Sequence, residues 1–193
     1  MSSYVIWKFK VVRNACALKQ LAGFDAINQL FHGVPLEVIF PRGVAFHMNP
    51  DYPTDLTLTD NLRNVHSCMV VSSRLAKVLQ ARNLTKLEYL PVAIIDHKGK
   101  VASDDYFILN PIELVDCIDR KKSVFKESAI KPGEISLCEK LVLDESCIPP
   151  DRQLFRLKGY AALAVVAQNV ADELSAADFT GLRWLPTGGN PMK

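Results

Sequence analysis

Motifs that carry common enzyme chemistry are missing from this sequence of 193 residues. It contains no G-x-S-x-G nucleophile elbow, no Walker phosphate loop, no G-x-G-x-x-G dinucleotide fingerprint and no H-E-x-x-H zinc motif. Its one glycine pair, Gly188-Gly189, lies in the C-terminal tail with no predicted helix after it, so it offers no phosphate site. These absences argue against several classes of hydrolase, nucleotide-binding protein and metalloprotease, and we expect the protein not to be an enzyme.

Long hydrophobic runs and a strong charge of one sign are also absent. Lys8 and Lys10 interrupt the apolar N-terminal stretch, and no other apolar run reaches the length of a membrane span. The formal net charge is +2; residues 1–97 carry 10 basic and 7 acidic groups, and residues 98–193 carry 13 and 14. We therefore expect a cytoplasmic protein that binds neither membranes nor nucleic acid.

Cysteines and histidines are few and widely spaced. The cysteines are odd in number and form no C-x-x-C pair, which favours reduced, buried thiols over disulfides or a zinc site: Cys16, Cys68, Cys117, Cys138 and Cys147. The histidines lie 15, 19 and 31 residues apart, so no two have ligand spacing: His32, His47, His66 and His97. We expect no metal and no cofactor. A Cys–His nucleophilic pair that meets only in space stays open as an alternative.

A repeated stretch is the main positive signal. Val165–Pro186 aligns without gaps with Val70–Pro91 at an offset of 95 residues, and nine of the 22 positions are identical. Each copy has two valines, a helix with apolar residues three or four apart, a turn and a half-buried strand. Because the shared residues are apolar, small or turn-forming, the pattern predicts a duplicated strand-helix-strand unit of the scaffold. The alternative is a common pattern that occurs twice by chance.

The rest of the chain favours further strands. Residues 4–12 alternate as a strand does, and other strands are expected at Leu87–Asp96, Asp105–Leu109, Ser136–Leu143 and Gln153–Leu157. A short helix is expected at Asp25–Phe31, a loop at Pro41–His66 with a short strand at Asp55–Thr59, and a strand at Ile112–Ile118. The pattern indicates an α+β fold with a mixed, largely antiparallel β-sheet and a few packed helices. We expect residues 1–193 to form a single α+β domain, or two pseudo-repeat lobes at 1–97 and 98–193.

The two helices of the repeat carry opposite charge. The first helix carries the basic residues Arg74, Lys77 and Arg82. The second carries the acidic residues Asp172, Glu173 and Asp178. Two interpretations are open. Each helix has its own solvated face, or one helix meets a charged protein partner, for which complementary charge raises the association rate.

Several short runs, in this order and spacing, resemble a known family. They are Val70 to Leu79 (VVSSRLAKVL), Pro91-Val92, Asp105 to Pro111 (DYFILNP), Val115 to Phe125 (VDCIDRKKSVF), Leu154 to Gly159 (LFRLKG) and Leu163 to Leu185. Together they resemble the α+β immunity-protein family of bacterial polymorphic toxin systems, the eleventh in that catalogue, first described from a myxobacterial protein. Ala167 departs from the family pattern, which favours serine ahead of the helix, as at Ser72.

The resemblance implies a non-catalytic cytoplasmic inhibitor that binds a toxin domain encoded by a neighbouring gene and protects the producing cell. It supplies no catalytic residues. For the contact surface we predict the irregular region His47–Asp60, with Tyr52 as anchor and Asp51, Asp55 and Asp60 as acids, together with Asp172 and Glu173 on the second helix.

Two other classes of function stay open. A small-ligand or regulatory binding module without catalysis predicts a preformed apolar pocket, for example in a cleft between the two repeat copies. An uncharacterised hydrolase predicts a concave site where a cysteine, a histidine and an aspartate converge.

Overall fold

The computed structural model describes residues 3–193, and strands predominate over helices in that part of the chain. The strands are β1 (Tyr4–Phe9), β2 (Ala17–Ala22), β3 (Ala45–Met48), β4 (Asn61–Asn64), β5 (Met69–Ser72), β6 (Leu87–Ile95), β7 (Val101–Pro111), β8 (Val124–Glu127), β9 (Ile135–Lys140), β10 (Leu154–Leu157), β11 (Tyr160–Ala167) and β12 (Leu182–Pro186). The helices are α1 (Ser73–Ala81) and α2 (Gln168–Ala176), with short 3-10 helices η1 (Ile27–Phe31) and η2 (Glu145–Cys147). No helix within residues 3–193 is long and apolar enough to cross a membrane.

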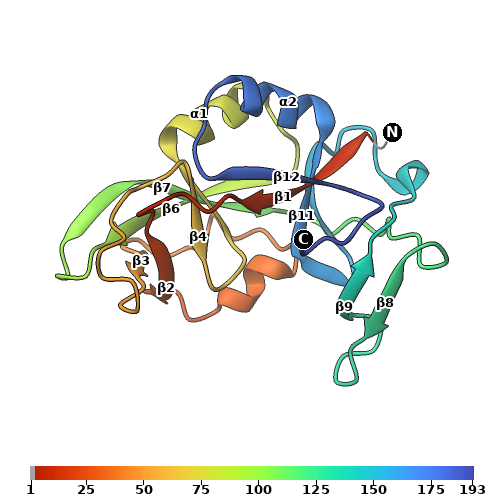
Figure 1. Cartoon of the computed structure of the whole chain (residues 1–193), viewed down its shortest axis with the longest axis horizontal. Coiled ribbons are helices and arrows are strands. Elements are labelled where there is room, and N and C mark those ends of the chain that lie inside the picture. Colours follow the sequence, from red (N-terminus) through yellow and green to blue (C-terminus); the bar gives the residue numbers. More distant parts are fainter. Residues whose placement is uncertain (1–2) are drawn as a thin grey trace.

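The strands form two main sheets and a separate hairpin (Figure 1). Six strands close into a barrel in the order β2-β3-β6-β7-β5-β4, and four form an open sheet in the order β10-β11-β1-β12. The β8–β9 hairpin projects from the body at the lower right of Figure 1. Neighbouring strands are antiparallel except for β2 with β4 and β3 with β6. The predicted α+β class with a mixed, largely antiparallel sheet therefore fits, whereas the sequence does not predict the closed barrel.

The two repeated segments adopt the same local topology. Each forms a strand, a helix and a strand, and its two strands lie on either side of one antiparallel neighbour, which is β7 in the barrel and β1 in the open sheet. The aligned residues also share one register against that neighbour: Val71 and Pro91 with Phe107, and Val166 and Pro186 with Val5. That a single duplication produced both segments stays a prediction.

Consecutive valines in both segments correspond to strands that are covered on both faces. Val70 belongs to the core inside the barrel, and Val165 belongs to the core on the opposite face of the open sheet. Val71 and Val166 point the other way, into one core that contains residues of both helices. A strand with one solvated face would alternate apolar and polar residues, so the paired valines follow from burial on both sides.

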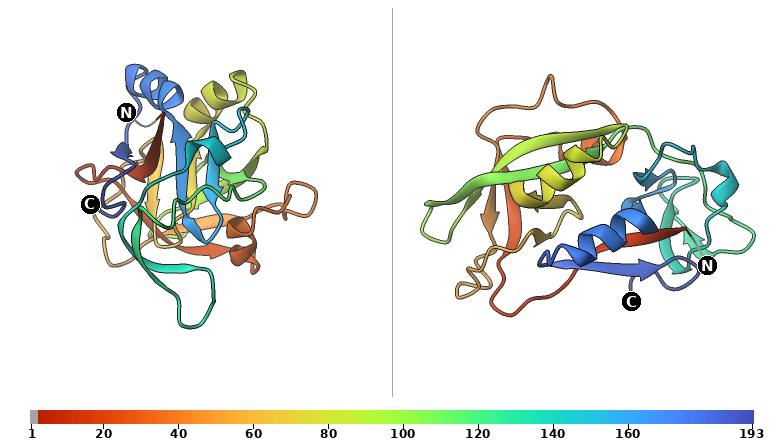
Figure 2. Two further views of the ribbon diagram at one scale, coloured as in Figure 1. Left: turned by 90° about the vertical axis from the view of Figure 1, so that its right-hand side faces the viewer. Right: turned by 90° about the horizontal axis from the view of Figure 1, so that it is seen from above.

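Helices α1 and α2 lie side by side over this shared core (Figures 1 and 2). Their buried faces are formed by Leu75, Ala76 and Leu79 in α1 and by Val170, Ala171 and Leu174 in α2. The Ser72 hydroxyl accepts a hydrogen bond from the Leu75 amide and caps α1. Ala167, at the equivalent position before α2, provides no such side-chain bond. The departure of Ala167 from the family pattern therefore coincides with the side-chain cap that α2 lacks.

The irregular region is shorter than the sequence predicts. Asp55–Thr59 is not a strand, and in it only Thr57 forms a bridge, with Ala15. The predicted loop Pro41–His66 contains β3 and β4 instead, so the irregular stretch between them is 49–60. Both strands are four residues long, and their partners are distant in sequence, which local patterns do not reveal.

Other local predictions also need correction. Ile112–Ile118 is not a regular strand, since only Val115 and Ile118 form isolated bridges. The helix predicted at Asp25–Phe31 is the 3-10 helix η1. The sequence does not predict β2 and β8, whose burial patterns lack a clean alternation. The division into lobes 1–97 and 98–193 stays a prediction; β1 lies in the sheet of β10 to β12, and residue 97 lies in the turn between β6 and β7.

Candidate functional site

Three of the predicted contact residues lie in the loop between β3 and β4, where Asp51 and Tyr52 are exposed and Asp55 is half-buried. Tyr52 is 43% exposed, and Tyr52 and Asp55 line the same small pocket. Asp51 forms an ion pair of 3.0 Å with Lys19 of β2. Because that pair is well exposed, it leaves the Asp51 carboxylate accessible to a partner at little cost in stability.

Asp60, the fourth residue of this group, is buried at the junction between the barrel and the open sheet. Its carboxylate accepts hydrogen bonds from the Ser72 hydroxyl (2.7 Å), the Arg74 guanidinium (2.8 and 3.2 Å) and the backbone amide and hydroxyl of Thr180 (both 2.9 Å). Burial alone would raise the pKa of Asp60, but the hydrogen bonds from Arg74, Thr180 and Ser72 outweigh it and lower the pKa to about 2. The charge of Asp60 is thus used to join the start of α1 to the turn before β12.

The acids of α2 face two different surroundings. Asp172 is exposed and accepts a hydrogen bond of 2.8 Å from Gln168 of its own helix. Glu173 forms an ion pair with Arg82 at the end of α1. Arg74 of α1 also lies 4.2 Å from the ring centroid of Phe179, just after α2. The opposite charges of the two helices therefore partly meet each other, an arrangement that neither of the two sequence interpretations includes.

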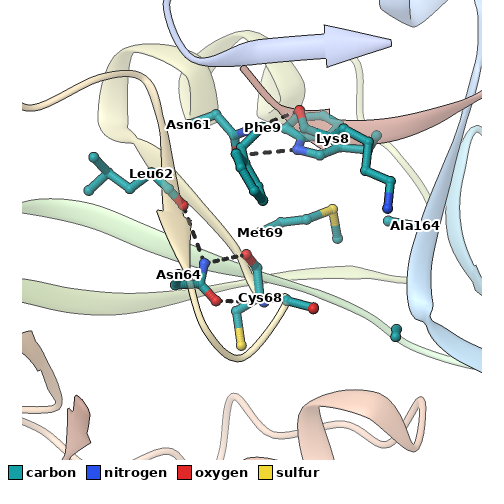
Figure 3. A pocket seen from close by; sticks show the side chains of 11 residues that line it. Lys8, Phe9, Asn61, Leu62, Asn64, Cys68, Met69 and Ala164 are labelled. Atoms are coloured by element: carbon teal, nitrogen blue, oxygen red, sulfur yellow. Dashed lines mark hydrogen bonds between the residues drawn. The ribbon is translucent and has the colours of Figure 1, made fainter. Parts of the chain in front are cut away.

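A small pocket of about 70 Å³ lies at the seam between β1 and β4 (Figure 3). Asn61 receives a hydrogen bond of 3.2 Å from the Trp7 indole and donates to the backbone oxygens of Lys8 and Gly181. Asn64 donates to the Cys68 carbonyl at 2.7 Å, and its side-chain oxygen accepts from the Cys68 amide. The Asn61 amide therefore fastens the seam, whereas the Asn64 amide closes the turn between β4 and β5. A pocket of about 70 Å³ has room for water molecules and little more.

The cysteines are poorly suited to nucleophilic catalysis. Four of the five are buried, and burial raises the pKa of Cys16 and Cys117 to about 12 and that of Cys68 to about 11. Such thiols stay protonated near neutral pH, whereas catalysis requires the thiolate. Within residues 3–193, no three His, Cys, Asp or Glu side chains are grouped so that they could hold a metal ion.

We expect a thiol reagent to distinguish the one exposed cysteine from the others. Cys147 is exposed on η2, so Ellman's reagent should modify one thiol per native chain within minutes at pH 8. All five thiols should react in strong denaturant. Rapid reaction of a second thiol in the native protein would show that one of the buried cysteines is accessible and activated, and would reopen the enzyme alternative.

A second, larger hollow on the described surface is an open groove of about 600 Å³. It lies between η1, the β4–β5 turn, the β8–β9 hairpin and the β10–β11 turn. We call it the groove; its lining includes Phe31, His32, His66, Lys131, Glu134 and Tyr160. His66 also donates a hydrogen bond of 2.9 Å from Nε2 to the backbone oxygen of Lys19, whose side chain pairs with Asp51. The groove and the predicted contact loop are therefore connected through β2.

Arg156 of β10 is buried directly behind the wall of the groove. It is 1% exposed, and burial lowers its pKa to about 10, so it still carries its charge at neutral pH. The guanidinium donates to the backbone oxygens of Ala161 (2.7 Å) and Ser67 (3.2 Å) and lies 4.8 Å from the Phe31 ring centroid. All three of these partners line the groove. Within residues 3–193 no carboxylate forms an ion pair with Arg156, and its Nε lacks a hydrogen-bond partner.

Sequence reasoning did not single out Arg156, although a signal was present. It is the only charged residue of the strand Leu154–Leu157, whose four positions are all buried. An arginine between apolar residues of a predicted strand indicates either a buried ion pair or a charge held for another purpose. Its surroundings come from η1 and the β4–β5 turn, far away in sequence, and only the fold reveals them.

Comparison with protein families gives a match. The model of a family described as an immunity protein family (Imm11) matches residues 21–188, a range that contains the groove, Arg156 and both repeated segments. A search of the curated proteins finds no match.

Proposed function

This chain belongs to the Imm11 immunity protein family, and from that premise we propose that it binds a cognate toxin domain encoded by a neighbouring gene and neutralises it in the cytoplasm of the producing cell. The family match over residues 21–188 is the observation that carries this proposal. Burial raises the pKa values of Cys16, Cys68 and Cys117, which argues against any of these three as a catalytic nucleophile.

For the contact surface we propose the exposed face of the loop, in which Asp51, Tyr52 and Asp55 touch the toxin. Tyr52 is a suitable anchor, because a half-exposed tyrosine buries a large area with little loss of side-chain entropy. Asp60 contributes indirectly, because its carboxylate already accepts hydrogen bonds from Ser72, Arg74 and Thr180. We propose that Asp60 holds the end of the loop against the rest of the fold.

We propose that Asp172 and Glu173 lie at the rim of the interface, where their charges steer the toxin during encounter. We expect Asp172→Lys to slow association about threefold at low salt and to leave dissociation unchanged, because rim charges act mainly on the association rate. Stopped-flow or surface plasmon resonance at two salt concentrations measures both rates. Asp104→Lys on β7 makes the same charge change at another exposed site and is the control. If both variants associate at the wild-type rate, the acidic helix is only a solvated face.

Growth protection tests the proposed function. The toxin domain of the neighbouring gene is induced in a bacterial host with and without this chain, and we expect growth only with the chain and co-purification of the two proteins. A catalytically dead toxin variant is the control for expression load. Persistent growth arrest, with the chain soluble and no complex recovered, would contradict the proposal.

A small-ligand module is the second candidate, because the volume of the groove is within the range of small-molecule pockets. It predicts that a small molecule, and no toxin, stabilises the isolated chain.

We also infer that the two strand-helix-strand segments descend from one duplicated unit. Their common topology and register support this, and so do the identical residues at nine aligned positions.

A further inference from the structure

The groove combines features that a small solvated hollow does not need. Behind it lies the charge of Arg156, which is buried without a carboxylate partner within residues 3–193, and at its rim lie Lys131, His32 and His66. Keeping an arginine charge out of water is costly unless an anion or several hydrogen bonds compensate it. Here two backbone oxygens and one aromatic ring provide only part of that compensation, and Nε has no partner in the described part of the chain.

The one acid of the groove does not satisfy this charge. Glu134 pairs with Lys131 at 3.8 Å, and the side chains are 54% and 63% exposed. A pair so long and so exposed is weak, so Lys131 is free to change partner. A carboxylate that enters the groove would meet Lys131 at the rim and the field of Arg156 across the wall formed by Phe31, Ser67 and Ala161. Away from bulk water, that field is screened less than at an open surface.

The hairpin beside the groove adds an apolar contact. Ile130 at the tip between β8 and β9 is 89% exposed, and the next residue is Lys131 of the groove. Figure 2 (left) shows the hairpin projecting well beyond the body of the molecule. An exposed isoleucine on a projecting tip contributes nothing to the binding of a small anion, but it is placed to pack against a protein surface that closes over the groove.

We propose that the groove is the docking site for an acidic loop of the toxin, which places an aspartate or glutamate carboxylate against Phe31 and Lys131 while Ile130 packs on the toxin surface. The inference rests on the proposed function and adds the place and the chemistry of the contact. The hydrogen bond from His66 to Lys19 and the ion pair from Lys19 to Asp51 connect the groove to the loop. The toxin would thus meet basic groups in the groove and acidic groups on the loop, a pattern that fixes its orientation.

Two exposed substitutions test the proposal without risk to the core. We expect Lys131→Glu and Ile130→Asp each to weaken toxin binding about tenfold, since the first reverses a contacting charge and the second removes an apolar anchor. The matched controls are Lys100→Glu, in the turn at the far end of the β6–β7 hairpin, and Val38→Asp, whose valine is 97% exposed. Both controls should bind within about twofold of wild type.

Arg156→Met tests the buried charge. We expect toxin affinity to fall by more than tenfold and its salt dependence to decrease, with the circular dichroism spectrum of the isolated variant unchanged. Should this variant not fold, Lys131→Glu and Ile130→Asp still decide the question. Isothermal calorimetry at two salt concentrations measures the toxin affinity of every variant and its salt dependence.

The outcomes separate the two proposals. If the wild-type chain protects cells and all groove variants bind like the wild type, the groove is not the docking site, and the immunity function stands. If the wild-type chain neither binds nor protects, both proposals are wrong. If inorganic phosphate raises the melting temperature of the wild type but not of Lys131→Glu, while toxin binding is the same for both, the groove is a small-anion site and the docking proposal is overturned.

Discussion

Gly181→Ala is expected to lower the free energy of unfolding by at least about 3 kcal/mol, the largest loss that we predict for a single added methyl group. Gly181 has a φ of +78°, in the left-handed region. A Cβ there would lie 2.4 Å from the Asn61 backbone oxygen and 2.9 Å from the Thr59 hydroxyl. The oxygen of Gly181 also accepts hydrogen bonds from the Lys10 amide (2.8 Å) and the Asn61 side-chain amide (3.0 Å), so the turn cannot move away without breaking bonds to the end of β1 and to β4.

Gly99→Ala is the matched control. Gly99 has a φ of +75°, but no atom lies within 4 Å of its added Cβ. The substitution should lower the free energy of unfolding by about 1 kcal/mol, because it adds only backbone strain. Urea denaturation at pH 7 gives both values, and their difference isolates the close packing at Gly181. Equal losses would contradict the tight contact between the Thr180-Gly181 turn and β4.

Asp60→Asn is expected to lower the free energy of unfolding by about 2 kcal/mol at pH 7, the second largest loss of stability that we predict. The substitution keeps the shape of the side chain but removes the charge that accepts hydrogen bonds from Arg74, Ser72 and Thr180. The folded pKa of about 2 lies below the ordinary value of 3.8. The contribution of Asp60 is therefore complete above pH 4 and is lost as the pH falls through the folded pKa.

The free energy of unfolding as a function of pH measures this contribution. The wild-type and Asp60→Asn curves should lie about 2 kcal/mol apart at pH 7 and converge between about pH 4 and pH 2. Asp172→Asn, at an exposed acid of α2, should follow the wild type throughout. A separation that stays constant down to pH 2 would mean that Asp60 stabilises the fold by its shape and not by its charge.

Local sequence patterns identify the parts of this fold whose structure depends on near neighbours. The two valines of each repeated segment indicate the strands that precede α1 and α2, and Ser72 indicates the cap of α1. The valines alone do not show that both faces of the strand are covered, because the same short apolar run is also compatible with a buried turn of helix. The central strand of each segment lies outside it in sequence, at β7 and β1.

The candidate site depends on contacts that are distant in sequence, and here prediction from sequence stops. Ser67 accepts the hydrogen bond of Arg156 from 89 residues away. The barrel closes through short parallel pairs, such as Ala17 with Arg63, that no local pattern reveals. Likewise, the acids and bases of the two helices are evident in the sequence, but that Glu173 meets Arg82 follows only from the position of α2 beside α1.

The central claim is that this chain inhibits a toxin by binding it. The most direct measurement is a titration of the purified toxin domain with the purified chain, in which binding heat and toxin activity are recorded together. We predict saturable binding with a dissociation constant below about 1 μM and a loss of toxin activity in proportion to the complex formed. Full toxin activity at a large excess of the folded chain, with no binding heat at two temperatures, would contradict the account.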